Sequence, residues 1–249
     1  MMKTILITGA TAGIGEACAS KFGVEGHRLV LTGRRQDRLN TMVENLSSKG
    51  VDAYAFCFDI TKKEEVDVAV KEIFHTVGTV DVLINNAGLA VGLELLHEGV
   101  VDDWERMIDT NIKGLLYMTR AIAPKMVEVQ EGHIINVSSI AGKDVYRFGN
   151  VYCATKHAVD ALSKAMRVDM IQDNIKVTNI APGMVETEFS LVRFKGDAAR
   201  ADKVYQQFAP LLAEDIADAI VYVTNTPKHV CINDLVITPT AQANPFYTV

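Results

Sequence analysis

Short runs of apolar, mostly β-branched residues alternate with longer amphipathic stretches along almost the whole chain. The apolar runs predict seven β-strands, at 3–8, 28–33, 53–58, 81–85, 132–139, 176–181 and 234–238. Between them, apolar residues recur at helical spacing and predict helices near 13–25, 35–49, 62–77, 102–128, 151–173 and 213–225. Several strands are apolar without alternation, which is typical of strands covered on both faces. The pattern therefore predicts an α/β fold in which a parallel sheet carries helices on both faces.

One polar segment interrupts this alternation. Residues 184–210 separate the sixth predicted strand from the next core helix, where a much shorter connection would suffice. Long insertions in compact α/β domains are often functional, for example as lids, and a surface excursion without function is the alternative. No Pro/Ser-rich linker, repeat or low-complexity block divides the chain. We therefore expect residues 1–249 to form a single domain with a lid-like, substrate-binding insertion at about 184–210.

Composition narrows the class of function. Of the 249 residues, 49% are hydrophobic and 22% are charged, and the net charge of −6 argues against a nucleic-acid-binding surface. No run of about 18 apolar residues predicts a membrane span, and the apolar run at the start is too short for a signal peptide. Cysteines and histidines are scattered without metal-ligand spacing. We expect free thiols, no metal and a cytoplasmic location.

A glycine-rich turn follows the first predicted strand and opens the first helix. Gly9, Gly13 and Gly15 occur there in the spacing GxxxGxG. Glycines at this place allow a tight turn and a close approach of the backbone to a phosphate, and the helix N-terminus offers N–H groups to a pyrophosphate. The alternative is a glycine-rich turn that binds no ligand. The position after a strand favours a dinucleotide site.

The end of the second predicted strand carries Arg34 and Arg35, where an NAD site would have a carboxylate for the ribose 2′-hydroxyl. An arginine can instead hold a 2′-phosphate with paired hydrogen bonds. One such bond is worth about 1.5–3 kcal/mol, or about tenfold to a hundredfold in affinity. The alternative is that both arginines only begin a solvated helix. The pair favours NADP.

Polar residues also follow the third and fourth strands. Asp59 and Ile60 follow the third, and the NNAG turn at 85–88 follows the fourth. Both places lie at carboxyl ends of strands, where open α/β sheets bind ligands. Asp59 could accept a hydrogen bond from an adenine amino group, whereas NNAG on its own indicates only a turn.

Five motifs occur in a characteristic order: TGATAGIG at 8–15, NNAG at 85–88, DTNIKG at 109–114, INVSSIAG at 135–142 and YCATK at 152–156. Together they resemble the short-chain dehydrogenase/reductase family, over residues 3 to about 240. The resemblance implies a Rossmann-type domain with three layers and a seven-stranded parallel sheet. The stretches WERMIDTNIKGLLYMTRA and TEFSLVRFKGD look like those of the bacterial NADP-dependent 3-hydroxy acid dehydrogenases, which also oxidise serine and allo-threonine.

The resemblance assigns roles to individual residues. It implies that Tyr152 and Lys156 form the catalytic YxxxK pair, that Ser139 rather than Ser138 is the catalytic serine, and that Asn111 holds a water that passes protons from Lys156 to solvent. The residues it implies for NADP are Gly9, Thr11, Gly13, Ile14, Gly15, Arg34, Arg35, Asp59, Ile60, Asn86, Ala87, Gly88, Tyr152, Lys156, Pro182, Gly183, Val185 and Thr187.

The spacing and the acid–base chemistry of Tyr152 and Lys156 agree with these roles. Residues at i and i+4 share a helix face, so Tyr152 and Lys156 can point at one site. To act as a base near pH 7, a tyrosine pKa has to fall from about 10 to about 7, which corresponds to about 4 kcal/mol. Lys156 and an oxidised nicotinamide ring are cations that could lower it. Ser139 would hydrogen-bond the substrate oxygen.

Each of these residues also has a structural explanation. Tyr152 could be a core aromatic, the serine pair a cap or turn, and Asn111 a polar residue bonded within its helix. Cys153 lies next to the tyrosine, but no histidine partner occurs at a recognisable spacing. The combination of motifs, in order and after the right strands, favours the catalytic reading.

A 3-hydroxy acid carries a carboxylate that requires a cation. Arg193 and Lys195 in the insertion, and Arg147 before the tyrosine, are the candidate substrate-binding cations, with Ser139 at the hydroxyl; Arg193 ranks first, and Arg147 departs from the family pattern. Two other functions stay open: reduction of another carbonyl (a keto-acyl thioester, a diketone or a steroid), and non-catalytic sensing of NADP. The family commonly forms tetramers, so we expect a homotetramer.

Overall fold

The computed structural model describes residues 2–206 and 208–249. A single seven-stranded sheet has the order β3-β2-β1-β4-β5-β6-β9, and every neighbouring pair is parallel. Its strands are β1 (Thr4–Thr8), β2 (Arg28–Gly33), β3 (Ala53–Cys57), β4 (Val82–Asn85), β5 (Gly132–Val137), β6 (Ile175–Pro182) and β9 (Asp234–Ile237). All seven predicted strands are confirmed, with small shifts at their ends. The strand order reverses at β1 and β4, which creates a crevice at their carboxyl ends.

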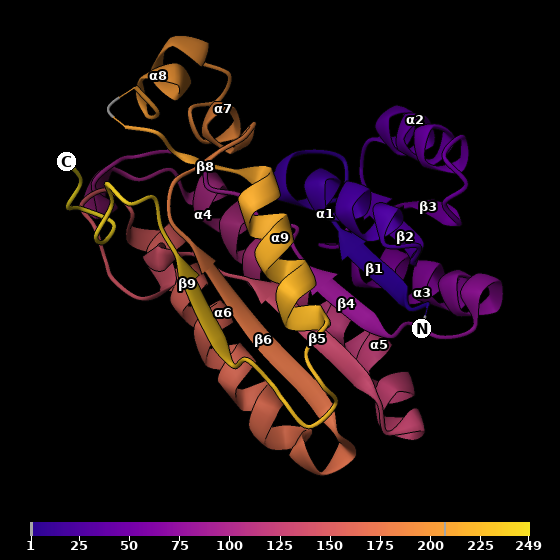
Figure 1. Ribbon diagram of the computed structural model, residues 1–249. Coiled ribbons are helices and arrows are strands. Elements are labelled where there is room, and N and C mark those ends of the chain that lie inside the picture. Colours follow the sequence, from indigo (N-terminus) through magenta and orange to yellow (C-terminus); the bar gives the residue numbers. More distant parts are fainter. Residues whose placement is uncertain (1, 207) are drawn as a thin grey trace.

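Helices cover both faces of this sheet, as the hydrophobic pattern predicts (Figure 1). On one face lie α1 (Gly13–Val24), α2 (Gln36–Ser47) and α9 (Ala213–Thr224). On the other lie α3 (Lys63–Val77), α5 (Leu115–Val129) and α6 (Asn150–Asp169). The fold is thus a three-layer, Rossmann-type α/β domain. None of the helices in the described residues is long and apolar enough to cross a membrane.

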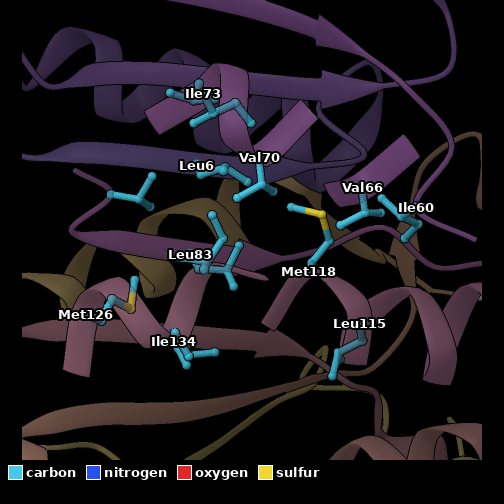
Figure 2. Close-up of a cluster of buried hydrophobic side chains, with 14 of the residues drawn as sticks. Leu6, Ile60, Val66, Val70, Ile73, Leu83, Leu115, Met118, Met126 and Ile134 are labelled. Atoms are coloured by element: carbon cyan, nitrogen blue, oxygen red, sulfur yellow. The ribbon is translucent and has the colours of Figure 1, made fainter. Parts of the chain in front are cut away.

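Each face of the sheet packs its own apolar core. Successive strand residues alternate between the faces: Leu6 belongs to one core, while Ile5 and Ile7 belong to the other. Figure 2 shows the first core, where Leu6, Leu83 and Ile134 of the strands meet side chains of α3 and α5. Burial on both faces explains why these strands read as continuous apolar runs.

The helix predicted at 102–128 is interrupted. It consists of α4 (Val101–Ile108), a π-helical turn η2 (Asp109–Gly114) and α5. A π turn inserts one extra residue into a helix, and such turns are frequent at functional sites. The predicted helix at 151–173 likewise ends at Asp169, and a 3₁₀ turn, η4 (Ile171–Asp173), follows it. Two further 3₁₀ turns are η1 (Leu96–Glu98) and η3 (Ile140–Gly142).

The polar segment at 184–210 has its own small structure. Strand β7 (Val185–Glu186) pairs in parallel with β8 (Leu211–Leu212), so the two ends of the segment are held together. Between them lie the short helices α7 (Phe189–Arg193) and α8 (Ala198–Lys203). Figure 1 shows both helices beyond the carboxyl end of β6, next to β8. The sequence predicts the segment but not these elements.

Candidate active site

A cavity of about 390 Å³ opens at the carboxyl ends of the strands, beside the point where the strand order reverses. It receives residues from every loop that the motifs singled out, and from α6 and the 184–210 segment. The predicted site residues that line it are Gly9, Thr11, Gly13, Ile14, Arg34, Arg35, Asp59, Ile60, Asn86, Ala87, Gly88, Ser139, Tyr152, Lys156, Pro182, Gly183, Val185 and Thr187. The structure therefore brings together groups far apart in the sequence.

The glycine-rich turn forms one wall of this cavity. Gly9 and Gly13 have φ angles of +63° and +54°, in the left-handed region where other residues are strained. A Cβ on Gly13 would lie 3.0 Å from the Thr187 side chain, so the 184–210 segment rests directly on the turn. The N-terminus of α1 has no side-chain cap. Its first N–H groups are therefore available to an anion such as a pyrophosphate.

Two residues predicted to bind the coenzyme shape the turn itself. Gly15 does not line the cavity; a Cβ there would lie 2.4 Å from the carbonyl oxygen of Gly9, so its role is close packing of helix against turn. Asn86 lines the cavity, but its Nδ2 donates to the carbonyl oxygens of Thr8 at 2.9 Å and Gly9 at 3.1 Å. The NNAG motif thus fixes the conformation of the glycine turn.

Both arginines after β2 line the cavity, in different ways. The Arg35 guanidinium donates to the Thr11 hydroxyl, at 2.8 and 3.0 Å, and to the Thr11 carbonyl at 3.1 Å. Arg34 is 65% exposed and lies 3.7 Å from an Asp59 carboxylate oxygen. The chain therefore presents two guanidinium groups at this end of the cavity.

Tyr152 and Lys156 lie on α6 with their side chains buried, 8% and 6% exposed. Lys156 Nζ lies 5.9 Å from the centre of the Tyr152 ring and donates to the Val137 carbonyl at 2.9 Å. Within the described part of the chain no carboxylate pairs with this ammonium group. Burial consequently lowers the pKa of Lys156 to about 8. Both residues face the cavity from the same helix face, as their spacing predicts.

The two serines after β5 have different partners. The Ser138 hydroxyl donates to the backbone carbonyl of Lys156 at 3.2 Å and so ties α6 to the sheet. The Ser139 hydroxyl donates to the Pro182 carbonyl at 3.4 Å and accepts from Ala141 N–H at 3.1 Å, and its interaction with the Tyr152 hydroxyl lowers the pKa of that phenol. Of the two, Ser139 is the hydroxyl that contacts the tyrosine.

Asn111 lies in the π-helical turn and is 2% exposed. Its side chain accepts from Leu89 N–H and donates to the Leu89 carbonyl, both at 2.8 Å, and it donates to the Thr155 hydroxyl at 3.0 Å. Gly88 separates it from Lys156, because a Cβ on Gly88 would lie 3.3 Å from both Asn111 Oδ1 and Lys156 Nζ. Asn111 does not line the cavity and braces the loop after β4 against α6.

The electrostatics of Tyr152 depart from the expected lowering. Burial raises the pKa of the phenol, and this effect exceeds the opposing effects of the Ser139 hydrogen bond and the nearby Arg193. The side chains of this chain alone therefore do not make the tyrosine a base near neutral pH. For Tyr152 to act as a base, its pKa would have to be lowered further, for example by cationic charge on a bound molecule.

The three candidate cations for a carboxylate occupy different surroundings. Arg193, at the end of α7, has its Cζ 5.5 Å from the ring centres of both Tyr152 and Tyr146, and it donates to the Tyr146 hydroxyl at 2.8 Å. Lys195 instead pairs with Asp103 at 2.7 Å, and Arg147 is exposed over the ring of Phe148, at 4.6 Å. None of the three is among the residues that line the cavity, although Val192, next to Arg193, is one of them. Only Arg193 lies against the candidate catalytic tyrosine.

Several residues near the site were not predicted from the sequence, among them Arg106, which lines the cavity. Phe189 places its ring 5.7 Å from that of Tyr152, and Glu188 lines the cavity while it pairs with Arg35 and Arg38. Nothing in the sequence around Glu188 indicates that it pairs with arginines about 150 positions earlier in the chain. Arg38 follows Arg35 at helical spacing, and that spacing was the available hint.

Known proteins are similar to this chain over nearly its whole length. A model of the short chain dehydrogenase family matches residues 3–197. The NADP-dependent 3-hydroxy acid dehydrogenase YdfG of Escherichia coli (strain K12) is 45% identical over 240 residues, 96% of each chain. Sulfoacetaldehyde reductase 2 of Chromohalobacter salexigens is 41% identical over 244 residues, 98% of this chain and 96% of that protein.

A solved structure agrees with these relatives. The closed form of serine dehydrogenase complexed with NADP⁺ has a TM-score of 0.92 and 44% sequence identity, and the match covers 99% of this chain and 98% of that one. Fold, motifs and sequence identity lead to the same family. The chain belongs to the short-chain dehydrogenases and is an oxidoreductase.

Proposed function

We propose that this enzyme transfers a hydride between C3 of a 3-hydroxy acid and NADP, with Tyr152 as the general acid and base. The observation that carries the substrate class is the position of Arg193. Its guanidinium lies against the Tyr152 ring, its Nε is buried without a hydrogen-bond partner, and no carboxylate in the described residues pairs with it. A carboxylate of the substrate would supply that partner.

The coenzyme half of the cavity fits NADP. The uncapped N-terminus of α1 and the turn from Gly9 to Gly13 would hold the pyrophosphate, and Arg34 and Arg35 the 2′-phosphate. Asp59 and Ile60 would contact the adenine, and the stretch from Pro182 to Thr187 would hold the nicotinamide end. When bound, NADP would accept or supply the hydride, and its oxidised ring would add positive charge to the site.

Each catalytic side chain then has a task that its surroundings support. Tyr152 Oη removes the proton of the substrate hydroxyl during oxidation and returns it during reduction. Ser139 donates a hydrogen bond to the same substrate oxygen and steadies its developing charge. Lys156, held by the Val137 carbonyl, adds positive charge that favours the phenolate and would bind the ribose hydroxyls. Asn111 fixes the loop beside Lys156 through its bonds to Leu89 and Thr155, and its proposed part in holding a water between Lys156 and solvent rests on the family resemblance alone.

Arg193 selects the substrate class in this scheme. It is carried by the segment at 184–210, which we propose acts as a lid over the substrate. Gly92 N–H donates to the Arg193 carbonyl at 3.0 Å, so the loop after β4 and the end of α7 close together on the substrate side. The guanidinium lies next to two aromatic rings and its Nε is buried, and a hydrogen bond to a carboxylate is stronger in such a less polar setting than in water.

The test compares an acid with its neutral ester in matched variants. We expect Arg193→Gln to lower kcat/KM for 3-hydroxypropionate by about tenfold to a hundredfold more than for methyl 3-hydroxypropionate. Lys195→Gln is the control, because that residue lies two positions away and pairs with Asp103. It should leave the acid-to-ester ratio unchanged. Equal losses on acid and ester in Arg193→Gln would refute the carboxylate site.

We also propose that the enzyme is a cytoplasmic homotetramer. The four cysteines are unpaired, as expected in a reducing compartment. Helix α6 exposes Ala161 and Ala165 together with Val168, which is 73% exposed, and the C-terminal Phe246 and Tyr247 are also exposed. Small and apolar residues on a helix surface suit close packing against another subunit. Light scattering of the purified protein should give the mass of a tetramer; the mass of a monomer would refute the proposed assembly.

A further inference from the structure

Glu188 connects the 184–210 segment to the arginines after β2. Its carboxylate accepts from Arg35 Nη1 at 3.0 Å and from Arg38 Nη1 at 2.8 and 3.1 Å. Glu188 immediately precedes α7, whereas Arg35 and Arg38 lie at the start of α2. These hydrogen bonds lower the pKa of Glu188, so it stays ionised at neutral pH.

Arg35 and Arg38 both point their guanidinium groups at the place that the Glu188 carboxylate occupies. Three of the Arg35 hydrogen bonds go to Thr11 of the glycine turn, which fixes the guanidinium and leaves Nη1 for an anion. Arg38 Nη1 converges on the same carboxylate from the next turn of the helix. A carboxylate and a phosphate offer the same paired oxygens to guanidinium groups. Glu188 therefore takes up donors that the 2′-phosphate of NADP would use.

Charge repulsion disfavours a state in which both anions share these donors. A 2′-phosphate brings nearly two negative charges, and a carboxylate within hydrogen-bond reach of the same nitrogens would repel it strongly. A coenzyme without that phosphate leaves the Glu188 pairs intact. The preference for NADP over NAD thus depends on two opposing effects: the arginines attract the 2′-phosphate, and Glu188 has to be displaced from them first.

We propose that Glu188 is a specificity-determining residue that competes with the 2′-phosphate for Arg35 and Arg38, and that Arg38 is a phosphate-binding residue in addition to Arg34 and Arg35. The inference rests on the proposed use of NADP. It implies that Glu188 weakens the binding of 2′-phosphorylated nucleotides and has no effect on their unphosphorylated counterparts. The phosphate displaces Glu188 because its greater charge binds two guanidinium groups more strongly.

The experiment measures binding by calorimetry, with 2′,5′-ADP and 5′-AMP as probes that differ only in the 2′-phosphate. The three side chains are about half exposed, so solvent screens their charges and the effect should be modest. We expect Glu188→Gln to bind 2′,5′-ADP about threefold to tenfold more tightly than wild type and to bind 5′-AMP within about twofold of wild type. Arg38→Gln should weaken 2′,5′-ADP by a similar factor without affecting 5′-AMP. Glu186→Gln is the control: it removes the same charge from an exposed position of the same segment and should affect neither probe.

The outcomes separate this inference from the proposed coenzyme. One outcome is that wild type binds 2′,5′-ADP more tightly than 5′-AMP while Glu188→Gln binds 2′,5′-ADP more weakly than wild type or equally well. That result would refute the competition by Glu188, and the NADP assignment would stand. An equal gain in Glu186→Gln would likewise refute it, because the effect would then be general electrostatics. If wild type binds both probes equally, the NADP assignment fails and this inference fails with it. Unchanged 5′-AMP binding shows that each variant is folded.

Discussion

The buried ammonium of Lys156 should lower the stability of the folded enzyme, and replacing it should raise that stability. Its side chain is 6% exposed and its Nζ has one hydrogen bond, to the Val137 carbonyl. Burial lowers the pKa of Lys156 from 10.5 to about 8. Below pH 8 the group is charged in both folded and unfolded states, and the folded state then pays about 3 kcal/mol for the charge. Lys156→Met removes that cost at nearly constant shape.

The sign of the pH dependence follows from proton binding. Between pH 8 and 10.5 the unfolded chain holds the Lys156 proton while the folded protein releases it, so the wild-type free energy of unfolding rises with pH. Loss of the Val137 hydrogen bond costs the variant about 1 kcal/mol. We therefore expect Lys156→Met to be more stable than wild type by about 2 kcal/mol at pH 7, and this advantage to shrink by about 2 kcal/mol at pH 9.5.

Urea unfolding at a series of pH values, with activity measured in parallel, tests this reasoning. Lys164→Met is the control, because that lysine is on the same helix but 65% exposed and paired with Asp160. Its difference from wild type should be small and independent of pH. Lys156→Met should lose turnover while it gains stability, as expected where a catalytic group is held in an unfavourable environment. A stability difference that stays constant from pH 7 to pH 9.5 would refute the buried-charge argument.

Two further predictions concern groups of β5 and the loop after it. Ser139→Ala should lower kcat by about a hundredfold. Ser138→Ala should mainly reduce stability, because the Ser138 hydroxyl donates to the Lys156 carbonyl. Equal losses of kcat in the two variants would contradict the choice of Ser139 as the catalytic serine. His133 is buried and neutral, with a pKa lowered to about 3, so its contribution to stability is complete above pH 6.5 and is lost as pH falls toward 3. Between pH 7.5 and pH 5, the free energy of unfolding of His133→Gln, measured in urea, should therefore fall by about 2 kcal/mol less than that of wild type. Equal decreases in the two proteins would show that His133 does not cause the acid destabilisation.

The regular part of the fold could be predicted from the sequence because each element is long enough to show its period. Strands buried on both faces give apolar runs, and α3 and α9 each bury one stripe. The exceptions are short or irregular. Strands β7 and β8 have two residues each, and α7 has five, so none shows a period. The π turn at 109–114 adds one residue to a continuous pattern and leaves no trace in composition.

Within the site, the residues predicted at strand ends do line the cavity. Loops after β1, β2, β4 and β5 must meet at one edge of a parallel sheet, so the lining of the cavity followed from topology. Side chains in the 184–210 segment could not be placed in this way. Arg193 and Lys195 are neighbours in the sequence, yet Lys195 has a φ of +54° where α7 ends, and it pairs with Asp103 away from the cavity.

The 184–210 segment carries the residues that we propose for both coenzyme and substrate selectivity. Thr187 rests on Gly13, Glu188 holds the arginines of the coenzyme end, and Phe189 contacts the ring of Tyr152. Arg193 follows on the same short helix. Because β7 and β8 hold the base of the segment together, these contacts belong to one local unit, while Ser139 and Lys156 sit on the sheet and on α6. We therefore expect substitutions in the segment to alter which coenzyme and which acid bind, while Ser139 and Lys156, the groups proposed for catalysis, keep their positions.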